Sequence, residues 1–547
     1  MKKKLLKFFI GFLLFIVVFA IWFSQNWYKM PKYIGDWKNP TGKNITINWE
    51  KGPEIRTSDK PNVIVILVDD LGFNQISSYG GGMSNGNFKT PNIDKLANDG
   101  VLCTNGYSSS PICSPSRAAL LTGRFPTRFG YEFTPTASTF MKGISLFSKD
   151  NGVAPYIYND EKEKDIINIE KMGLPQSEIT IAEMLKPQGY HNVHIGKWHL
   201  GHSNEFLPRK QGFDESLRID QGSLFLPKDD PNVVNAKLEF DPIDKILWGN
   251  LPYAVNFNEG PRMEPKGHLT DYLTDEAVKF IEYNKNRPFF LYMAYWAVHS
   301  PLQAKIEDYE KLDYIENHEE RVLASMVMTV DRGVGKIRKA LKDSGIDDNT
   351  IIVFISDNGA PGYIGLPDLN KPYRGWKLTH FEGGIHVPFI VSYPNKIPAG
   401  KVYSGRVSNL DIFSTFSNIA QVDLRNSELD GVDILPYLIG EKEGEPERII
   451  FNKSGKYSYI LKNGWKLQVN LIQNKKWLFN LNQDPNEQND LSKINLNKLK
   501  ELEEILNKKL SEQSKPIWPS LADSPIFIDK TLNKKKNMND EYIYWSN

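Results

Sequence analysis

The sequence Pro111-Ile112-Cys113-Ser114-Pro115-Ser116-Arg117, which continues as Ala118-Ala119-Leu120-Leu121-Thr122-Gly123-Arg124, places a cysteine at the start of a predicted helix. Pro115 suits the first turn, where its missing N–H is not needed, and Ser114 or Ser116 can cap the free amides of that turn. A cysteine at a helix N-terminus next to an arginine lies in a positive field, which favours a thiolate and binds anions. The alternative is a buried cysteine that only precedes an ordinary helix.

The pattern Cys-x-Pro-Ser-Arg at positions 113–117, followed by Leu-Thr-Gly at 121–123, resembles the signature of the type I sulfatases, a branch of the alkaline phosphatase superfamily. In this family the cysteine is oxidised after synthesis to formylglycine, an aldehyde whose hydrate is the nucleophile. The resemblance therefore implies that Cys113 is catalytic and that Arg117 stabilises the hydrate. It also implies that a formylglycine-generating enzyme is a partner during maturation.

The composition indicates a protein with a sizeable core and no nucleic-acid surface. The chain has 547 residues, 40% of them hydrophobic, and a formal net charge of +1. This length predicts one large domain and a smaller one, and the near-zero charge argues against a nucleic-acid partner. The only cysteines are Cys103 and Cys113, so no disulfide framework is expected. A disulfide between these two would exclude the formylglycine.

The N-terminal residues 1–27 have the pattern of a membrane signal anchor. Lysines at positions 2, 3, 4 and 7 accompany an apolar run that ends at Phe23 and is about long enough to span a bilayer. Positive charge on the near side keeps the N-terminus in the cytoplasm, and Trp22, Trp27 and Tyr28 are predicted to form an interfacial belt. No small-x-small cleavage site follows, so an uncleaved anchor is favoured over a cleaved signal peptide. Residues 28–60 are predicted to be a linker, and the rest is predicted to be exported to the periplasm or the exterior.

Two buried strands are predicted to end in oxygen ligands. The apolar, β-branched run from Asn62 to Val68 is typical of a parallel strand covered on both faces, and it ends at Asp69-Asp70. The run from Thr350 to Ile355 ends at Ser356 and Asp357-Asn358. Adjacent carboxylates repel unless a cation lies between them, although either aspartate alone could be a helix cap. The sequence therefore predicts an all-oxygen metal site. The family holds Ca²⁺ on the matching residues, so the resemblance implies Ca²⁺, with Mg²⁺ second, and adds the oxidised Cys113 as a ligand.

Three further motifs carry cationic or titratable side chains and resemble family motifs: Gly196–Gly201 with Lys197 and His199, Trp296–Pro301 with His299, and Tyr373–Gly384 with Lys377. In an extended segment, Lys197 and His199 project to one side. The resemblance implies that Lys197 and Lys377 contact the sulfate and that His199 or His299 protonates the leaving alcohol. The Gly375-Trp376 pair before Lys377 departs from the family's usual Gly-Gly.

The alternation of strand, motif and helix predicts an α/β sandwich, with a large, mostly parallel central sheet flanked by helices. The catalytic domain is expected over residues 61–440. A small C-terminal α+β subdomain with an antiparallel sheet is expected over 441–515, where Lys462-Asn463-Gly464 is a hairpin turn and 496–513 an amphipathic helix. Residues 516–547 are expected to be a tail.

Two insertions, 133–173 and 218–262, adjoin the catalytic segments and are expected to surround the pocket. Trp248 and Tyr253 would offer flat faces for stacking on sugar rings, and Arg374 is a third candidate for substrate contact. The alternative is that these aromatic side chains only pack the insertions onto the core. Because export places the enzyme where sulfated glycans occur, a sulfated carbohydrate is the expected substrate.

Three other functions fit parts of the pattern. A phosphonate or phosphodiester hydrolase of the same superfamily could carry the same nucleophile. A catalytically retired glycan-binding protein should have lost the cysteine or a metal ligand, and both are present. A lipid-headgroup transferase of this superfamily usually has several membrane spans and a threonine nucleophile, which this chain does not match.

Overall fold

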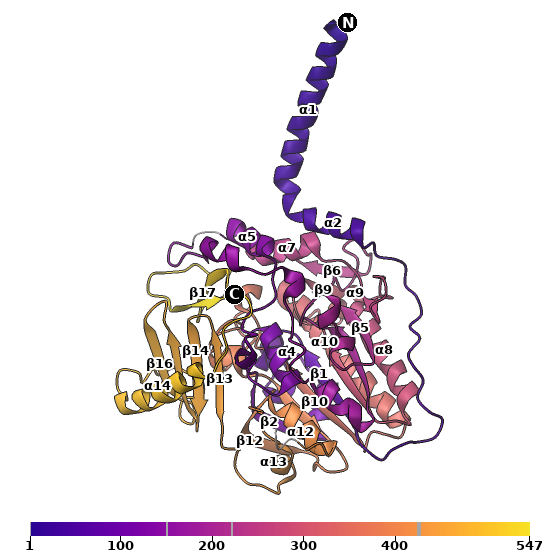
Figure 1. Cartoon of the computed structure of the whole chain (residues 1–547), viewed down its shortest axis with the longest axis vertical. Coiled ribbons are helices and arrows are strands. Elements are labelled where there is room, and N and C mark those ends of the chain that lie inside the picture. Colours follow the sequence, from indigo (N-terminus) through magenta and orange to yellow (C-terminus); the bar gives the residue numbers. More distant parts are fainter. Residues whose placement is uncertain (1, 149–150, 220–221, 424–427) are drawn as a thin grey trace.

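A nine-stranded sheet runs through the body of the computed structural model, which describes residues 2–148, 151–219, 222–423 and 428–547 (Figure 1). The strand order is β12-β2-β11-β10-β1-β8-β4-β5-β7. Five neighbouring pairs are parallel, whereas the pairings of β11 and of β7 are antiparallel. The large, mostly parallel sheet is thus confirmed. Its strands are β1 (Asn62–Val68), β2 (Val101–Tyr107), β4 (His191–Lys197), β5 (Glu215–Ile219), β7 (Asn256–Phe257), β8 (Phe289–Ala294), β10 (Thr350–Ser356), β11 (Phe389–Ser392) and β12 (Lys401–Ser408).

Helices cover both faces of this sheet. On β1, the side chains of Ile64 and Ile66 enter a core shared with α3, α8 and α10, whereas Val63 and Val65 enter a second core shared with α4, α6 and α12. A strand buried on both faces needs apolar residues at every position, which explains the unbroken apolar run. The flanking helices are α3 (Pro91–Asn98), α4 (Cys113–Thr122), α6 (Ile181–Leu185), α8 (Leu269–Asn284), α9 (Ile306–Glu310), α10 (His318–Asp343), α11 (Glu382–Ile385), α12 (Asp411–Ile419) and α13 (Leu435–Ile439).

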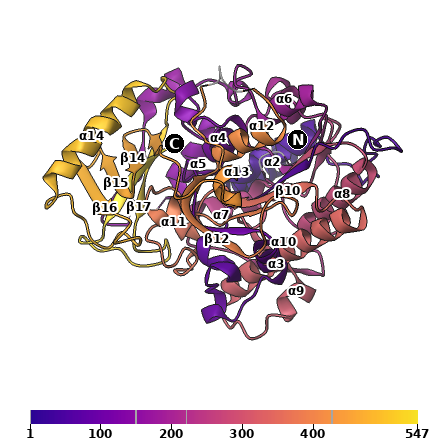
Figure 2. The same ribbon diagram turned by 90° about the horizontal axis from the view of Figure 1, so that it is seen from below.

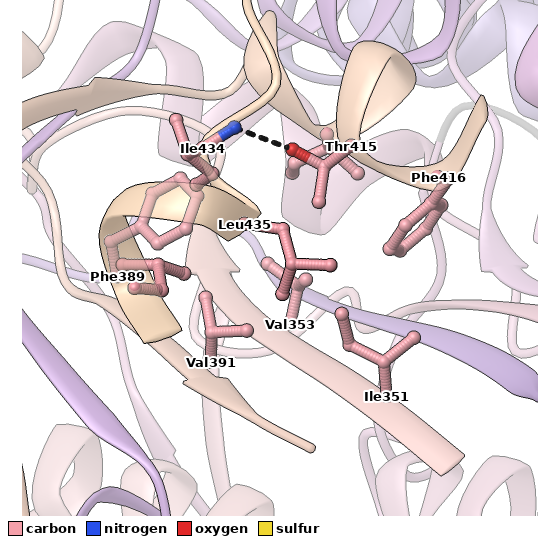
Figure 3. Close-up of a pocket in the computed structure, with 10 residues that line it drawn as sticks. Ile351, Val353, Phe389, Val391, Thr415, Phe416, Ile434 and Leu435 are labelled. Atoms are coloured by element: carbon pink, nitrogen blue, oxygen red, sulfur yellow. Dashed lines mark hydrogen bonds between the residues drawn. The ribbon is translucent and has the colours of Figure 1, made fainter. Parts of the chain in front are cut away.

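The second core is closely packed where β10 and β11 meet α12 and α13. A cavity of about 10 Å³ remains there, lined by residues such as Val353, Phe389 and Leu435 (Figure 3). The Ile434 backbone N–H donates to the Thr415 hydroxyl at its edge, at 3.1 Å. A space this small and apolar is suited neither to a water molecule nor to a ligand, so it belongs to the core.

A four-stranded antiparallel sheet forms the C-terminal subdomain, with α14 packed against it (Figure 2). Asn463 and Gly464, at the predicted hairpin turn between β14 and β15, both have positive φ, as a tight hairpin of this kind requires. Residues 516–547 contain two further strands, β17 and β18, which pair with each other, and β17 also pairs with β3 of the first insertion. The elements are β13 (Ile449–Ser454), β14 (Tyr457–Lys462), β15 (Trp465–Asn470), β16 (Lys475–Asn480), α14 (Leu496–Ser511), β17 (Ala522–Phe527), β18 (Tyr542–Ser546) and β3 (Ile157–Tyr158).

The N-terminal helix α1 (Lys2–Asn26) projects from the body as a separate rod (Figure 1). By length and composition it could cross a membrane, and its apolar residues are exposed. Residues 28–60 begin with a short helix rather than a plain linker, and then run along the body. The insertions also contain helices and strands. These elements are α2 (Met30–Lys38), α5 (Ser138–Phe147), β6 (Val233–Ala236), α7 (Pro242–Asn250) and β9 (Leu302–Lys305), the partner of β6.

Candidate active site

Four neighbouring parallel strands deliver their polar residues to one edge of the sheet. Val68 of β1 is in register with Ser356 of β10, so Asp69-Asp70 and Asp357-Asn358 follow directly from paired positions. Strand β8 leads to His299, and β4 ends at Lys197 and leads to His199. The carboxyl edge of an open α/β sheet is where such folds bind ligands. The structure therefore brings together all the residues for which the sequence predicted a catalytic or metal-binding role.

Cys113 is the first residue of α4 and points into this cluster. Its Sγ lies 3.2 Å from Asp69 Oδ1 and 3.7 Å from Asp70 Oδ1, and the residue is 2% exposed. Burial, together with the charges of Asp357 and Asp69, raises the pKa of the thiol well above its usual value. Burial first, and then the neighbouring carboxylates, therefore favour the thiol over the thiolate that a helix terminus beside Arg117 predicted. Cys103, buried in β2, forms no disulfide with it.

Arg117 holds the cluster together from inside α4. Its guanidinium donates two hydrogen bonds to Asp357 Oδ2, at 3.0 and 2.7 Å, and one to the Lys197 carbonyl oxygen at 3.0 Å. The same group lies 3.4 Å from Asp69 Oδ2, and none of the side chain is exposed. A planar fork with five donors can bridge α4, β4 and β10 in this way, whereas lysine could not.

Two lysines contact the aspartate pair that follows β1. Lys197 Nζ lies 2.5 Å from Asp69 Oδ2, and Lys377 Nζ lies 2.7 Å from Asp70 Oδ1. Burial disfavours the charge of Lys377, but Asp70 and other anionic partners raise its pKa above the usual value, so the ammonium is retained. Each ammonium group is thus held against one carboxylate of the pair.

The two histidines lie at the edge of the cluster. His299 Nε2 is 3.6 Å from Asp70 Oδ2, and its Nδ1 is 2.6 Å from the Ser300 carbonyl oxygen. Burial lowers the pKa of His299 to about 4 in spite of Asp70. His199 has a positive φ of 61°, and its Nδ1 is buried without a hydrogen-bond partner among the described residues. Burial, then Lys197 and Arg117, lower the pKa of His199, so both rings are neutral near pH 7.

The donor atoms of the cluster suit a cation. Asn358 Nδ2 donates to Asp70 Oδ1 at 2.7 Å, which leaves Asn358 Oδ1 buried, with no partner among the described residues. Burial and the carboxylate of Asp69 raise the pKa of Asp357 to about 7, the sign of a site crowded with negative charge. Ligand atoms of Asp69, Asp70, Cys113 and His299 also lie within 4.8 Å of one another. The residues present therefore fit a divalent metal ion.

Comparison with known proteins agrees with this geometry. Residues 61–422 match the family described as Sulfatase, and residues 375–516 match the one described as N-sulphoglucosamine sulphohydrolase, C-terminal. The chain belongs to the sulfatase family. N-acetylgalactosamine-6-sulfatase of Canis lupus familiaris is 34% identical over 400 residues, which are 70% of this chain and 66% of that protein, slightly less than two thirds of its length.

Two further relatives of this sulfatase extend the comparison. Steryl-sulfatase of Homo sapiens is 30% identical over 501 residues, covering 80% of this chain and 79% of that protein. The crystal structure of Ps i-CgsB in complex with k-i-k-neocarrahexaose superposes with a TM-score of 0.69 and 32% identity, covering 84% of this chain and 94% of that one. Most of the chain therefore has the fold of a solved relative.

Two aromatic residues of the site were not given a role from the sequence. The Tyr363 hydroxyl donates to Asp70 Oδ2 at 3.2 Å and accepts from Lys377 Nζ at 3.3 Å. The Trp296 ring stacks on His299, with centroids 4.3 Å apart, and lies 4.6 Å from Lys197 Nζ. Trp296 could have been found from its place beside the His299 motif. Tyr363 lies in the short 3-10 helix Gly362–Ile364, which follows Pro361 and offers no such signal.

The structure does not bring the three expected substrate residues to the cluster. Trp248 is 7% exposed and packs in the main core, so its ring is not free to stack on a sugar. Tyr253 packs against the same core, and its hydroxyl donates to the Pro265 carbonyl oxygen. Arg374 forms ion pairs with Asp529 and Glu541 of the C-terminal segment. Internal packing and ion pairing therefore account for all three positions.

Proposed function

We propose that this protein hydrolyses sulfate esters, with a formylglycine derived from Cys113 as nucleophile. The single observation that supports this most strongly is the position of Cys113 Sγ, within 3.7 Å of both Asp69 and Asp70, while Lys197 and Lys377 contact the same two carboxylates. A nucleophile, a cation site and two ammonium groups thus share one small volume. That set matches the needs of attack on an anionic ester.

Each side chain has a distinct part in the proposed reaction. Lys197 and Lys377 hold the sulfate oxygens, and Arg117 fixes the position of the oxidised residue 113 through its own helix. His199 or His299, protonated once a bound sulfate places negative charge beside its ring, gives a proton to the departing alcohol. When formed, the aldehyde hydrate would supply one hydroxyl to attack the sulfur and a second whose loss of a proton expels sulfate and restores the aldehyde.

We propose Ca²⁺ as the bound ion, with Mg²⁺ second. Asp69, Asp70, Asp357 and Asn358 would hold it through carboxylate and amide oxygens, which hard cations prefer. Such an ion would supply positive charge next to the sulfate and lower the pKa of a coordinated hydroxyl. Removal of divalent cations with a chelator should abolish activity, and Ca²⁺ should restore it better than Zn²⁺. Full activity after exhaustive chelation, or stoichiometric zinc in the purified protein, would contradict the assignment.

A sulfated carbohydrate is the proposed substrate class. The names of the relatives support it: an N-acetylgalactosamine-6-sulfatase and a structure solved with k-i-k-neocarrahexaose. The steryl-sulfatase match makes a sterol sulfate the competitor to exclude. We further propose that α1 anchors the protein and that the body is exported, because α1 carries an exposed apolar surface of membrane-spanning length.

One set of measurements tests the activity and the nucleophile together. Purified protein is assayed on defined sulfated oligosaccharides, a sterol sulfate, an aryl sulfate and an aryl phosphodiester, beside the Cys113→Ala variant. We expect turnover of at least one sulfated sugar, none by the variant, and a residue 113 lighter than cysteine by the difference between a thiol and an aldehyde. Unmodified Cys113 in fully active enzyme would refute the formylglycine. Faster turnover of the phosphodiester than of every sulfate ester would refute the proposal that sulfate esters are the substrates.

A further inference from the structure

The end of the body from which α1 emerges has a composition unlike that of an ordinary soluble surface. Figure 1 shows α2, α5 and α7 at this end, directly beneath α1. We call the surface formed by residues 27–38, α5 and α7 the anchor face. Three kinds of observation distinguish it: tight packing of the chain that leaves α1, outward-facing apolar side chains, and a group of lysines.

The chain that follows α1 is fixed to the body rather than loosely tethered. The Trp27 ring stacks on Phe147 of α5, with centroids 5.4 Å apart, and Tyr28 meets the same ring edge-on. The Asn250 side chain at the end of α7 donates to the Tyr28 carbonyl oxygen at 2.9 Å. Because these contacts follow α1 directly, no flexible segment separates the C-terminal end of α1 from the anchor face.

Helix α2 presents large apolar side chains outward. Tyr33 is 48% exposed, Ile34 49% and Trp37 82%; these positions lie on one side of a helix. Asp36 of the same helix forms an ion pair with Arg262 of the body at 3.4 Å. Leu146 at the end of α5 is 73% exposed. A tryptophan and a tyrosine beside aliphatic residues are typical of helices that lie in the plane of a membrane interface.

Lysines also lie on and beside the anchor face. Lys245 Nζ lies 5.2 Å from the Tyr28 ring centroid, and the Lys228 ammonium donates to the Trp248 carbonyl oxygen. Burial and the positive charges of Lys32, Lys29 and Lys237 lower the pKa of Lys228. Like charges held this close repel one another in the isolated protein, and anionic headgroups would relieve that repulsion.

We propose that the anchor face rests on an anionic phospholipid bilayer, with α2 lying in the headgroup region. This goes beyond the proposed catalytic function and rests on the proposed insertion of α1. The occupant is a bilayer rather than a protein, because the face is continuous with a helix of bilayer-spanning length. The body then has one fixed orientation on the membrane instead of moving freely about a tether.

The anchor face is also linked through the body to the catalytic cluster. Helix α7 ends at Asn250, whose side chain donates a hydrogen bond to Tyr28. Just before the start of α7, Phe240 lies against the backbone of Gly365, because a Cβ added at Gly365 would be 2.8 Å from the Phe240 ring. Gly365 follows the turn that contains Tyr363, and Tyr363 bonds to Asp70. A series of contacts through α7, Gly365 and Tyr363 therefore connects the anchor face to the catalytic cluster.

The test uses single cysteine labels in the full-length protein. Both native cysteines are buried, so a new exposed cysteine can be labelled selectively with an environment-sensitive nitrobenzoxadiazole probe. The labelled variants are Trp37→Cys on the anchor face, Ile55→Cys as a matched control of equal exposure (81% against 82%) beside the end of α8, and Phe15→Cys within α1. Each is reconstituted into phosphatidylcholine–phosphatidylglycerol vesicles that contain a lipid with a nitroxide near the headgroup.

We expect the position 37 probe to be quenched several-fold more than the position 55 probe and to emit at shorter wavelength. Replacing phosphatidylglycerol by phosphatidylcholine, or raising the salt concentration, should weaken that quenching because it screens the lysines. If the position 15 probe is quenched by the lipid nitroxide while the position 37 probe behaves like the position 55 probe, docking of the anchor face is refuted, whereas insertion of α1 is supported. If position 15 also reports water, both are refuted. None of these readouts uses sulfatase activity, so failure of the proposed reaction would be seen separately.

Discussion

The ammonium group of Lys377 contacts both oxygens of Asp70 and the hydroxyl of Tyr363. Lys377→Met keeps the length of the side chain and removes its charge. Loss of one charged donor at a developing negative charge typically lowers the rate about 10²- to 10³-fold, and we expect a loss of kcat/KM of that size on a sulfate ester. The matched control is Lys371→Met, six residues earlier and paired with Asp368. Similar kinetics for the two variants would argue against the role of Lys377.

His268 should make the stability of the protein sensitive to mild acid. Burial lowers its pKa from 6.5 to about 4, and neither ring nitrogen has a hydrogen-bond partner among the described residues. The unfolded chain therefore binds the proton at a higher pH than the folded one, so stability falls as the pH drops from about 6.5 towards 4. Between pH 7 and pH 5 this amounts to about 2 kcal/mol.

The measurement is the denaturant midpoint at both pH values for wild type, His268→Gln and His318→Gln, the last at an exposed position. The His268 variant should lose less stability on acidification than wild type, and the His318 variant as much as wild type. An identical loss in all three proteins would show that His268 does not titrate in this way.

For single residues, the sequence indicated which residues form the site but not how their side chains are buried or protonated. Cys113, Arg117 and the aspartates could be placed at one site because each follows a recognisable strand or motif. The protonation of Cys113 could not be predicted, because it depends first on burial and then on the carboxylates that follow β1 and β10, and folding supplies both. The prediction that Trp248 contacts the substrate was wrong for a related reason. An aromatic residue in an insertion gives the same sequence pattern whether it faces a pocket or the core.

Among the elements, β15 is joined to the segment that carries Lys377 by a buried ion pair. Lys466 Nζ lies 2.7 Å from Glu382 Oε1 of α11 and 2.9 Å from Glu487 Oε1, and all three side chains are almost completely buried. Removing one partner of such a group leaves an unpaired buried charge and costs about 3–5 kcal/mol. Lys466→Met should therefore lower the melting temperature strongly. Lys500→Met on exposed α14 should not; equal effects would contradict the assignment.

The elements that could be predicted are those buried on both faces. Strands β1, β8 and β10 are mostly apolar runs of six or seven residues, and a run this short and this apolar is typical of a strand in the middle of a sheet. Strand β12 could not be predicted, because it is partly exposed and its pairing with β2 shifts register between Tyr403 and Arg406. The short strands β3 and β7 have two residues each, too few for any periodicity.

For the molecule as a whole, residues 516–547 are a structural part rather than a loose tail. Trp518 and Trp545 are buried, and Trp518 packs edge-on against Tyr131, whose hydroxyl bonds to Ser114 next to Cys113. A chain that ends at Lys515 should lose much of its thermal stability, since burial of one tryptophan contributes about 3–5 kcal/mol. Met538→Ser, at a residue that is 78% exposed, should leave the melting temperature unchanged. A stable, soluble truncated protein would contradict this expectation.

Tertiary pairing of distant segments is the reason that this part could not be predicted. Strand β17 pairs with β3, about 365 residues earlier in the chain, and no local pattern indicates such a partner. The same applies to residues 28–38, whose polar composition indicated a linker, although Tyr28 and α2 pack on α7. The strands in the middle of the central sheet, β1, β8 and β10, needed no such distant information, because each carries its own signal.

The burial of Cys113 fixes an order of events in the life of the protein. Every residue of α4 is buried, so a maturation enzyme cannot bind this segment once the domain has folded. Under the proposed chemistry, oxidation must come first and folding second. Each newly made chain then has a single opportunity, and one that folds too early remains intact but permanently inactive. The fraction of modified molecules would accordingly report a competition between two rates, not the affinity of an enzyme for a finished protein.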